Sequence, residues 1–196
     1  LADIDGNIYN MVTIGSQVWM VENLKVTKYN DGTIIQLVTD YNEWINLTTG
    51  AYCWYDNILT NKNPYGALYN WYTVNTGKIC PLGWHVPTIN EWTALITFLG
   101  GPGVAGGKLK ESGTEHWTSP NLGATNESGF TAIGSGYRSG NPSINFTLFG
   151  IGAYWWSSTE SAEEMALGRS LWNGGAGSEQ IFTEKYYGFS VRCIKD

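Results

Sequence analysis

Histidine and cysteine, the side chains that most often act as bases, nucleophiles or metal ligands, are scarce in this chain of 196 residues. The only histidines are His85 and His116, which lie far apart in the sequence. A serine or cysteine nucleophile needs a histidine base that an acid orients, and no GxSxG turn is present to hold one. We interpret His85 as a structural or surface residue and His116 as part of a loop. A meeting of the two in the fold remains the alternative.

The three cysteines, Cys53, Cys80 and Cys193, allow at most one disulfide and leave one thiol free. Neither Cys80 nor Cys193 has a basic neighbour that would activate a thiolate. No CxxC pair or His/Cys cluster exists, which argues against a zinc site. We therefore expect a structural disulfide between Cys80 and Cys193, with Cys53 free and inert.

Other cofactor motifs are missing. The glycine-rich stretches 100–103 and 174–177 lack the GxGxxG and GxxxxGK[ST] patterns that hold phosphate groups. No EF-hand loop is present, although some acids are candidates for calcium ligands, namely Asp3, Asp5, Asp56 and Glu127. We expect these acids to be solvated surface groups and predict no cofactor, with a structural calcium ion as the alternative.

The composition excludes several classes of protein. The chain has only 11 Lys and Arg residues but 17 Asp and Glu residues, and the resulting net charge of -6 disfavours nucleic-acid binding. No apolar run approaches the roughly 18 residues of a membrane span. Aromatic residues make up 14% of the chain, which argues against disorder. The length suits one domain over residues 1–196, and residues 1–5 are not expected to be a secretion signal.

The elements that must position any site are short. Residues 9–14 and 17–20 flank a Gly-Ser turn and predict a hairpin. Residues 88–100 predict the clearest helix, because Thr88 and Glu91 form a capping box and apolar residues follow at helical spacing. Residues 104–111 predict a shorter helix, and residues 40–66 a long packed loop. We expect further strands at 130–133, 154–157 and 188–194, the last half-buried, in one α+β domain with few helices.

The segment 161–187 has no helical or strand period, yet patterned pieces border it on both sides. Its exposed-type aromatics, mixed with serine and glycine, are typical of binding surfaces, because Tyr and Trp give much contact area for little lost entropy. An ordinary loop with buried aromatics is the alternative. The candidate ligand-binding residues are Ser161, Glu164, Gly168, Ser170, Trp172, Gly174, Gly175, Gly177, Glu179, Ile181, Phe182, Thr183, Glu184, Tyr186 and Tyr187.

Motifs along the whole chain resemble the Fibrobacter succinogenes major paralogous domain family. They occupy residues 3–7, 17–25, 66–71, 80–88 with 91–92, 123–130, 155–160 and 188–193. The segment 84–92 also resembles the helix entry of formylglycine-generating-enzyme-like domains. The resemblance implies a C-type-lectin-like fold with a small twisted antiparallel sheet, one or two helices, long loops and close termini.

The same resemblance bears on function. The enzyme branch of the wider group uses reactive cysteines or copper, and no matching cysteine pair is present here. Sugar-binding lectins use a Trp-Asn-Asp strand, of which only Trp172 and Asn173 match. The family also includes variable proteins of diversity-generating retroelements, whose C-terminal residues are rewritten at Asn codons. We therefore expect a non-enzymatic ligand-binding protein with a variable segment at 161–187, located outside the cell, on a cell surface or on a phage particle.

The expected partner is a protein or a glycan at a surface, without nucleic acid or a membrane span. A carbohydrate-binding or adhesive cell-surface module is the alternative function.

Overall fold

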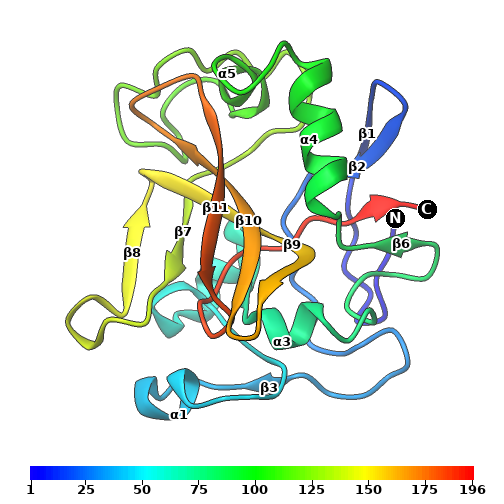
Figure 1. Ribbon diagram of the computed structural model, residues 1–196, viewed down its shortest axis with the longest axis vertical. Coiled ribbons are helices and arrows are strands. Elements are labelled where there is room, and N and C mark those ends of the chain that lie inside the picture. Colours follow the sequence, from blue (N-terminus) through cyan, green and yellow to red (C-terminus); the bar gives the residue numbers. More distant parts are fainter.

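Three β-sheets and five α-helices, of which only one exceeds five residues, form the computed structural model of residues 1–196 (Figure 1). The five-stranded sheet comprises β11 (Ser178–Glu184), β10 (Met165–Trp172), β9 (Gly152–Ala162), β7 (Ser135–Arg138) and β8 (Phe146–Phe149), in that order. The four-stranded sheet comprises β1 (Met11–Ile14), β2 (Gln17–Met20), β12 (Ile194–Lys195) and β6 (Trp84–His85). The three-stranded sheet comprises β3 (Gln36–Leu37), β4 (Ala51–Cys53) and β5 (Leu68–Tyr69).

The α-helices are α1 (Tyr41–Ile45), α2 (Lys62–Tyr65), α3 (Trp71–Val74), α4 (Ile89–Phe98) and α5 (Ala105–Leu109). Three 3-10 turns, at Tyr55–Asn57, Leu59–Asn61 and Pro142–Ile144, complete the elements. This mixture of short helices and β-sheets confirms the α+β class. The expectation of one small antiparallel sheet is wrong, because there are three sheets, and β7 with β9 and β3 with β4 pair in parallel.

Helix α4 confirms the strongest local prediction. Thr88 accepts from the backbone N–H of Glu91, while the Glu91 carboxylate accepts from the backbone N–H of Thr88, so two free donors are satisfied together. Trp92, Leu95 and Ile96 are buried and place the apolar face of the helix against the core. Helix α5 and the β1–β2 hairpin also form where they were predicted, over slightly shorter ranges.

Other sequence-based expectations need correction. Residues 40–66 are not a plain loop: they contain α1, which Asp40 caps, as well as β4 and α2. Residues 130–133 form no strand and make only the bridge between Lys110 and Ala132. Thr131 there has a φ of 54°, which is incompatible with an extended strand.

The C-terminal stretch 188–194 is fully buried rather than half-buried. Its backbone forms bridges to three strands in turn: Gly188 pairs with β7, Phe189 with β5 and Ser190 with β9. Only Ile194 and the residue after it form a strand, β12. The alternation of polar and apolar residues is real, but the polar side chains find buried partners instead of solvent.

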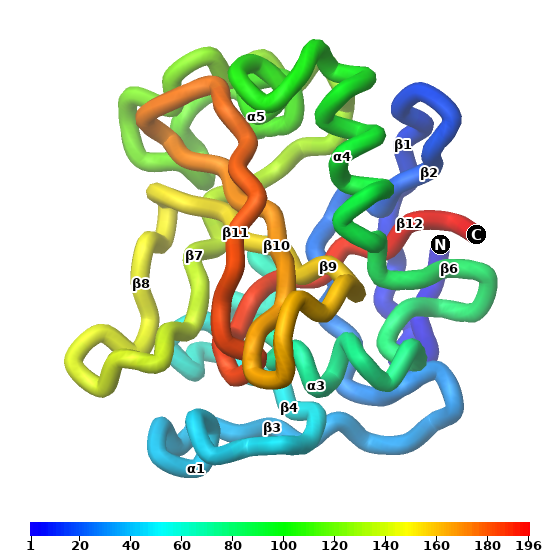
Figure 2. The backbone as a smooth tube through the Cα atoms, in the orientation of Figure 1, coloured from blue at the N-terminus to red at the C-terminus, as the bar shows by residue number.

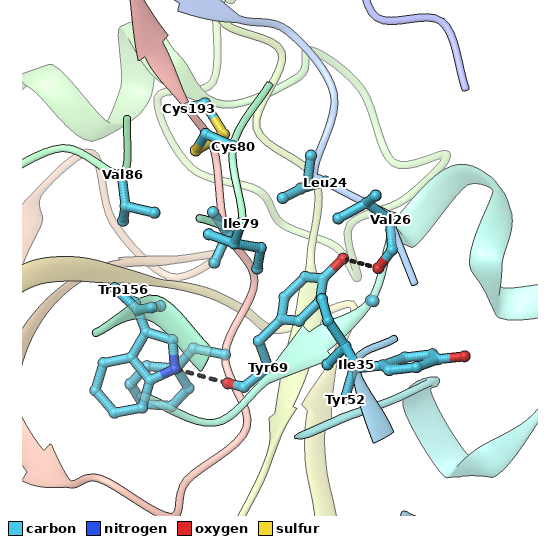
Figure 3. Packing of buried hydrophobic residues seen from close by; sticks show 14 of the residues in the cluster. Leu24, Val26, Ile35, Tyr52, Tyr69, Ile79, Cys80, Val86, Trp156 and Cys193 are labelled. Atoms are coloured by element: carbon cyan, nitrogen blue, oxygen red, sulfur yellow. Dashed lines mark hydrogen bonds between the residues drawn. A yellow bond between two sulfur atoms is a disulfide. The ribbon is translucent and has the colours of Figure 1, made fainter. Parts of the chain in front are cut away.

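The largest core cluster lies around this stretch (Figure 3). Tyr69 donates its hydroxyl to the Val26 carbonyl at 2.8 Å, and the indole of Trp156 donates to the Tyr69 carbonyl at 2.7 Å. Cys80 and Cys193, the pair expected to be bonded, form a disulfide at the edge of the same cluster. Cys53 is buried and free.

A second core cluster carries a buried polar centre at Asn23. The side-chain carbonyl of Asn23 accepts from the Arg192 Nε at 2.9 Å and from the Trp155 indole at 2.9 Å. Arg192 is 1% exposed and also donates to the carbonyls of Phe130 and Thr131. Its guanidinium carbon lies 4.1 Å from the Phe130 ring centroid, so the buried cation is both hydrogen-bonded and stacked.

The two ends of the chain lie close together, near the loop at residues 81–83 (Figure 2). There His85 bridges two acids, with Nε2 2.9 Å from Glu91 and Nδ1 2.7 Å from Asp196. Burial alone would lower the pKa of His85, but the hydrogen bonds and charges of Asp196 and Glu91 outweigh it and raise that pKa above 6.5. His85 is thus a structural residue here.

We expect the His85 contacts to stabilise the fold below pH 6.5 and to weaken as the pH rises through the raised pKa of His85. Stability falls with rising pH because His85 holds its proton more tightly in the folded state than in the unfolded state. These groups are partly exposed, so the effect should stay below about 1 kcal/mol. Thermal unfolding of the wild type and of His85→Gln at pH 6 and pH 8.5 checks this prediction. An equal difference between the two proteins at both pH values would contradict it.

Candidate functional site

Most of the segment 161–187 forms a regular β-hairpin, so its interpretation as irregular is wrong. Strands β10 and β11 pair over seven residues without a break, from Met165 opposite Glu184 to Leu171 opposite Ser178. Strand β10 lies between β11 and β9 and is buried on both faces from Ala166 to Leu171. A strand covered on both faces loses the alternation of polar and apolar residues, which is why the sequence pattern failed here.

A surface cleft of about 530 Å³ lies where this hairpin turns. Its lining residues come from the hairpin and from the neighbouring strand β9, and they are Tyr154, Ser170, Leu171, Trp172, Gly174, Gly175, Gly177, Glu179 and Ile181. Trp172 is 48% exposed and offers an aromatic face at the cleft. Seven of these nine residues belong to the predicted binding set, whereas Tyr154 and Leu171 were missed. Tyr154 shares its sheet face with Ser170, its direct partner on β10.

The polar side chains of the cleft are free of protein partners. Neither the Tyr154 hydroxyl, the Ser170 hydroxyl nor the Glu179 carboxylate makes a hydrogen bond within the chain. Burial, followed by the charges of Tyr137 and Glu179, raises the pKa of Tyr154 well above its usual value, so its hydroxyl stays protonated. The cleft therefore presents one carboxylate, two hydroxyls and an indole, with no basic residue among its lining side chains.

The turn that shapes the cleft is fixed from below by Lys110. This buried side chain donates to three backbone carbonyls, of Leu122 at 2.9 Å, Trp172 at 3.0 Å and Gly175 at 2.8 Å. Burial lowers the pKa of Lys110 to about 8, so the charged form still predominates at neutral pH. The side chain of Asn173 adds a bond to the Thr118 carbonyl at 3.0 Å. The cleft is thus preorganised by contacts that leave its lining side chains free.

Helix α5 supports the same turn at very close range. A Cβ placed on Gly106 would lie 1.9 Å from the Gly177 carbonyl oxygen, so no larger residue fits there. The next residue, Gly107, donates its backbone N–H to the Ala176 carbonyl at 2.9 Å. The two glycines that weaken α5 as a helix are therefore the residues that allow the turn to pack against it.

The remaining predicted residues do not line the cleft. Ser161 and Glu164 lie at the opposite end of the hairpin, where β9 turns into β10 (Figure 1). Gly168 and Thr183 are buried. Phe182 is 64% exposed but pairs with Leu167, whereas Ile181 in the cleft pairs with Gly168.

Successive residues of a strand point to opposite faces, so Phe182 lies on the face away from the cleft. Glu184 pairs with Met165 near the far end and is partly exposed. None of the four aromatic residues singled out in this segment is buried in the core: Trp172 and Phe182 are exposed, and Tyr186 and Tyr187 are partly exposed.

Tyr186 and Tyr187 extend the aromatic surface beside the cleft. Tyr187 stacks on Tyr137 with ring centroids 5.8 Å apart, and Tyr137 contacts Tyr154 at 4.6 Å. Tyr154 lines the cleft, so this chain of aromatic contacts connects the cleft to the loop after β11. Tyr186 packs against Gly140, while its carbonyl accepts from the Trp44 indole at 2.6 Å.

The acids considered for calcium do not converge on one site. Asp3 accepts hydrogen bonds from its own turn and from the Tyr9 hydroxyl. Asp5 binds Thr27 and Lys28, and Glu127 pairs with Lys108 at 2.9 Å. These carboxylates serve local contacts, and Asp3 is buried rather than solvated as expected.

Among the helices of the structure, none has the length and apolar character needed to cross a membrane.

Comparison with known proteins gives one match. The profile of the family described as Fibrobacter succinogenes major domain matches residues 12–195, nearly the whole chain. No curated protein and no solved structure matches.

Proposed function

The chain belongs to the Fibrobacter succinogenes major domain family, and from this premise we propose that it is a non-enzymatic ligand-binding protein whose binding site is the β10–β11 cleft. The observation that carries the proposal is the set of unused polar groups around Trp172. Buried polar groups in proteins are normally hydrogen-bonded, yet Ser170 is buried and unpaired. Tyr154 and Glu179 are more exposed and likewise keep their polar atoms available to a ligand in the cleft.

The hydrogen bonds that fix the turn favour a role of the cleft in ligand binding over an incidental surface depression. Lys110 and Asn173 fix the backbone of the turn, so little ordering is needed when a ligand arrives. The exposed indole supplies apolar area, and Ser170 with Glu179 supplies directional acceptors. Because no basic group lines the cleft, the favoured ligand is a neutral or cationic one that donates hydrogen bonds.

We also propose that the scaffold is C-type-lectin-like and that the hairpin is a segment open to diversification by a retroelement. Eight of the nine cleft residues lie from Ser170 to Ile181, within the segment 161–187 expected to vary. The neighbouring DNA tests this proposal. A reverse transcriptase gene and a near-identical repeat of the 3′ end of the coding sequence are expected. The proposed location is the outside of the cell, a cell surface or a phage particle.

A carbohydrate is the second candidate ligand. Sugars stack on aromatic faces and donate hydroxyl groups, and the cleft offers Trp172 and Tyr154 beside the free carboxylate of Glu179. Loss of binding with a chelator on a glycan array would favour a calcium-dependent lectin. Capture of a surface protein without metal would favour a protein ligand.

Trp172→Ala is expected to lower the affinity for a captured ligand at least tenfold, because it removes the main aromatic contact of the cleft. Phe182→Ala is the matched control, since this still more exposed aromatic lies on the other face of the same hairpin. Binding isotherms of both variants and the wild type, on the glycan or surface protein that the array identifies, make the measurement.

The control shows which face of the hairpin binds the ligand. If Phe182→Ala loses affinity while Trp172→Ala keeps it, the ligand binds the other face and the cleft is not the site. Unfolding curves accompany each isotherm, so that a change in affinity is not confused with a loss of fold.

A further inference from the structure

A cluster of two carboxylates and one imidazole lies away from the cleft, in the loop after α5. Glu111, Glu115 and His116 bring their ligand atoms within 4.8 Å of one another. Both carboxylate oxygens of Glu111 lie 2.9 Å from Nδ1 of His116. Tetrahedral ligands about 2.1 Å from a zinc ion lie about 3.4 Å apart, so Glu111 and His116 are already near the spacing of shared coordination.

The negative charge of this cluster is poorly neutralised. No lysine or arginine lies within 4 Å of either carboxylate, and Glu115 makes no hydrogen bond at all within the chain. The Glu111 side chain is only 17% exposed, so solvent screens it weakly. A divalent cation would offset the excess charge.

A buried acceptor next to the cluster is also unused. Asn121 is 6% exposed, and its amide nitrogen donates to the carbonyls of Glu111 at 2.9 Å and Gly113 at 2.7 Å. Its side-chain oxygen is buried and accepts no hydrogen bond from the protein. A buried amide oxygen costs free energy unless a donor or cation meets it. Asn121 thus fixes the backbone of the loop that carries Glu111, while its own buried oxygen remains available to a donor or a cation.

We propose that Glu111, Glu115 and His116 bind a divalent transition-metal ion of the zinc type. The imidazole selects against Ca²⁺ and Mg²⁺, which prefer oxygen ligands alone. Glu115 is exposed and makes no hydrogen bond, so its side chain is free to move closer to the other two ligands. Three protein ligands leave a coordination position open, and Glu115 and His116 border a surface pocket of about 250 Å³ lined also by Tyr65 and Phe149.

The proposal is tested on the full chain without a polyhistidine tag, with ZnCl₂ as the probe and CaCl₂ and MgCl₂ for comparison. Calorimetry is expected to show one zinc ion per chain, and thermal unfolding a rise of about 5 °C at saturating zinc. Glu115→Gln and His116→Gln should each lower the zinc affinity at least tenfold. Glu115 has no hydrogen bond to lose, so Glu115→Gln probes the site without disturbing the fold.

Two variants serve as controls. His85→Gln removes the other histidine that sits between carboxylates, and Glu127→Gln removes an exposed acid that pairs with Lys108. Both are expected to bind zinc as the wild type does. The absence of saturable zinc binding, equal affinity in Glu115→Gln, or loss of binding in His85→Gln would each overturn the proposal. None of these outcomes depends on whether the cleft binds a ligand.

Discussion

Asn23→Leu is expected to lower the free energy of unfolding by about 3–5 kcal/mol. The similar size of leucine keeps the volume, but the side-chain carbonyl that accepts from Arg192 and Trp155 is lost. Arg192 would then hold a buried charge with an unsatisfied Nε–H, in a place that excludes water. Urea unfolding followed by tryptophan fluorescence measures the change.

Asn10→Leu is the control for this prediction. Asn10 also bonds through its side chain, but its contact with Glu22 is exposed, so its loss should cost less than about 0.5 kcal/mol. A similar small loss in Asn23→Leu would mean that Arg192 and Trp155 find other acceptors. The buried polar centre would then be less important to the fold than its geometry indicates.

Removing the disulfide by Cys80→Ala with Cys193→Ala is expected to cost about 3–5 kcal/mol. The bond joins residues 113 positions apart, and cross-linking so long a loop restricts the unfolded chain strongly. It also holds the buried C-terminal stretch against the main core cluster. Urea unfolding of the double variant against the wild type measures the effect.

Reductant provides an internal control for the disulfide. Dithiothreitol should shift the unfolding midpoint of the wild type and leave that of the double variant unchanged. Cys53 is buried and already a free thiol, so a response that persists in the double variant would require a disulfide between two chains. Such a response would contradict the assignment of the stabilisation to Cys80 and Cys193.

Local chemistry allowed the helices and hairpin with clear terminal signals to be predicted. Thr88 and Glu91 are three residues apart and satisfy each other within one turn, so the start of α4 is specified locally. The stretch 188–194 could not be interpreted in the same way. Its arginine resembles a solvent-facing residue, and only the distant Asn23, Phe130 and Thr131 make its burial favourable.

The candidate site was predicted in part, for a physical reason. Composition indicated a binding surface between 161 and 187, and Trp172, Glu179 and Ile181 do line the cleft. Composition cannot separate the two faces of a strand, so it placed Phe182 in the same set. Lys110 and Tyr154 come from other parts of the chain, and no local pattern connects them to the hairpin.

The way in which the turn of the β10–β11 hairpin is held limits the kinds of sequence change that the cleft tolerates. The rest of the fold holds this turn by hydrogen bonds to its backbone at residues 172, 173, 175, 176 and 178. These bonds do not depend on which side chains the turn residues carry. Replacement of an exposed lining side chain, such as that of Trp172 or Glu179, leaves all of these bonds in place. An insertion or a deletion would shift them out of register together. Loop length should therefore be invariant among functional versions of this hairpin, while the chemistry it displays is free to change.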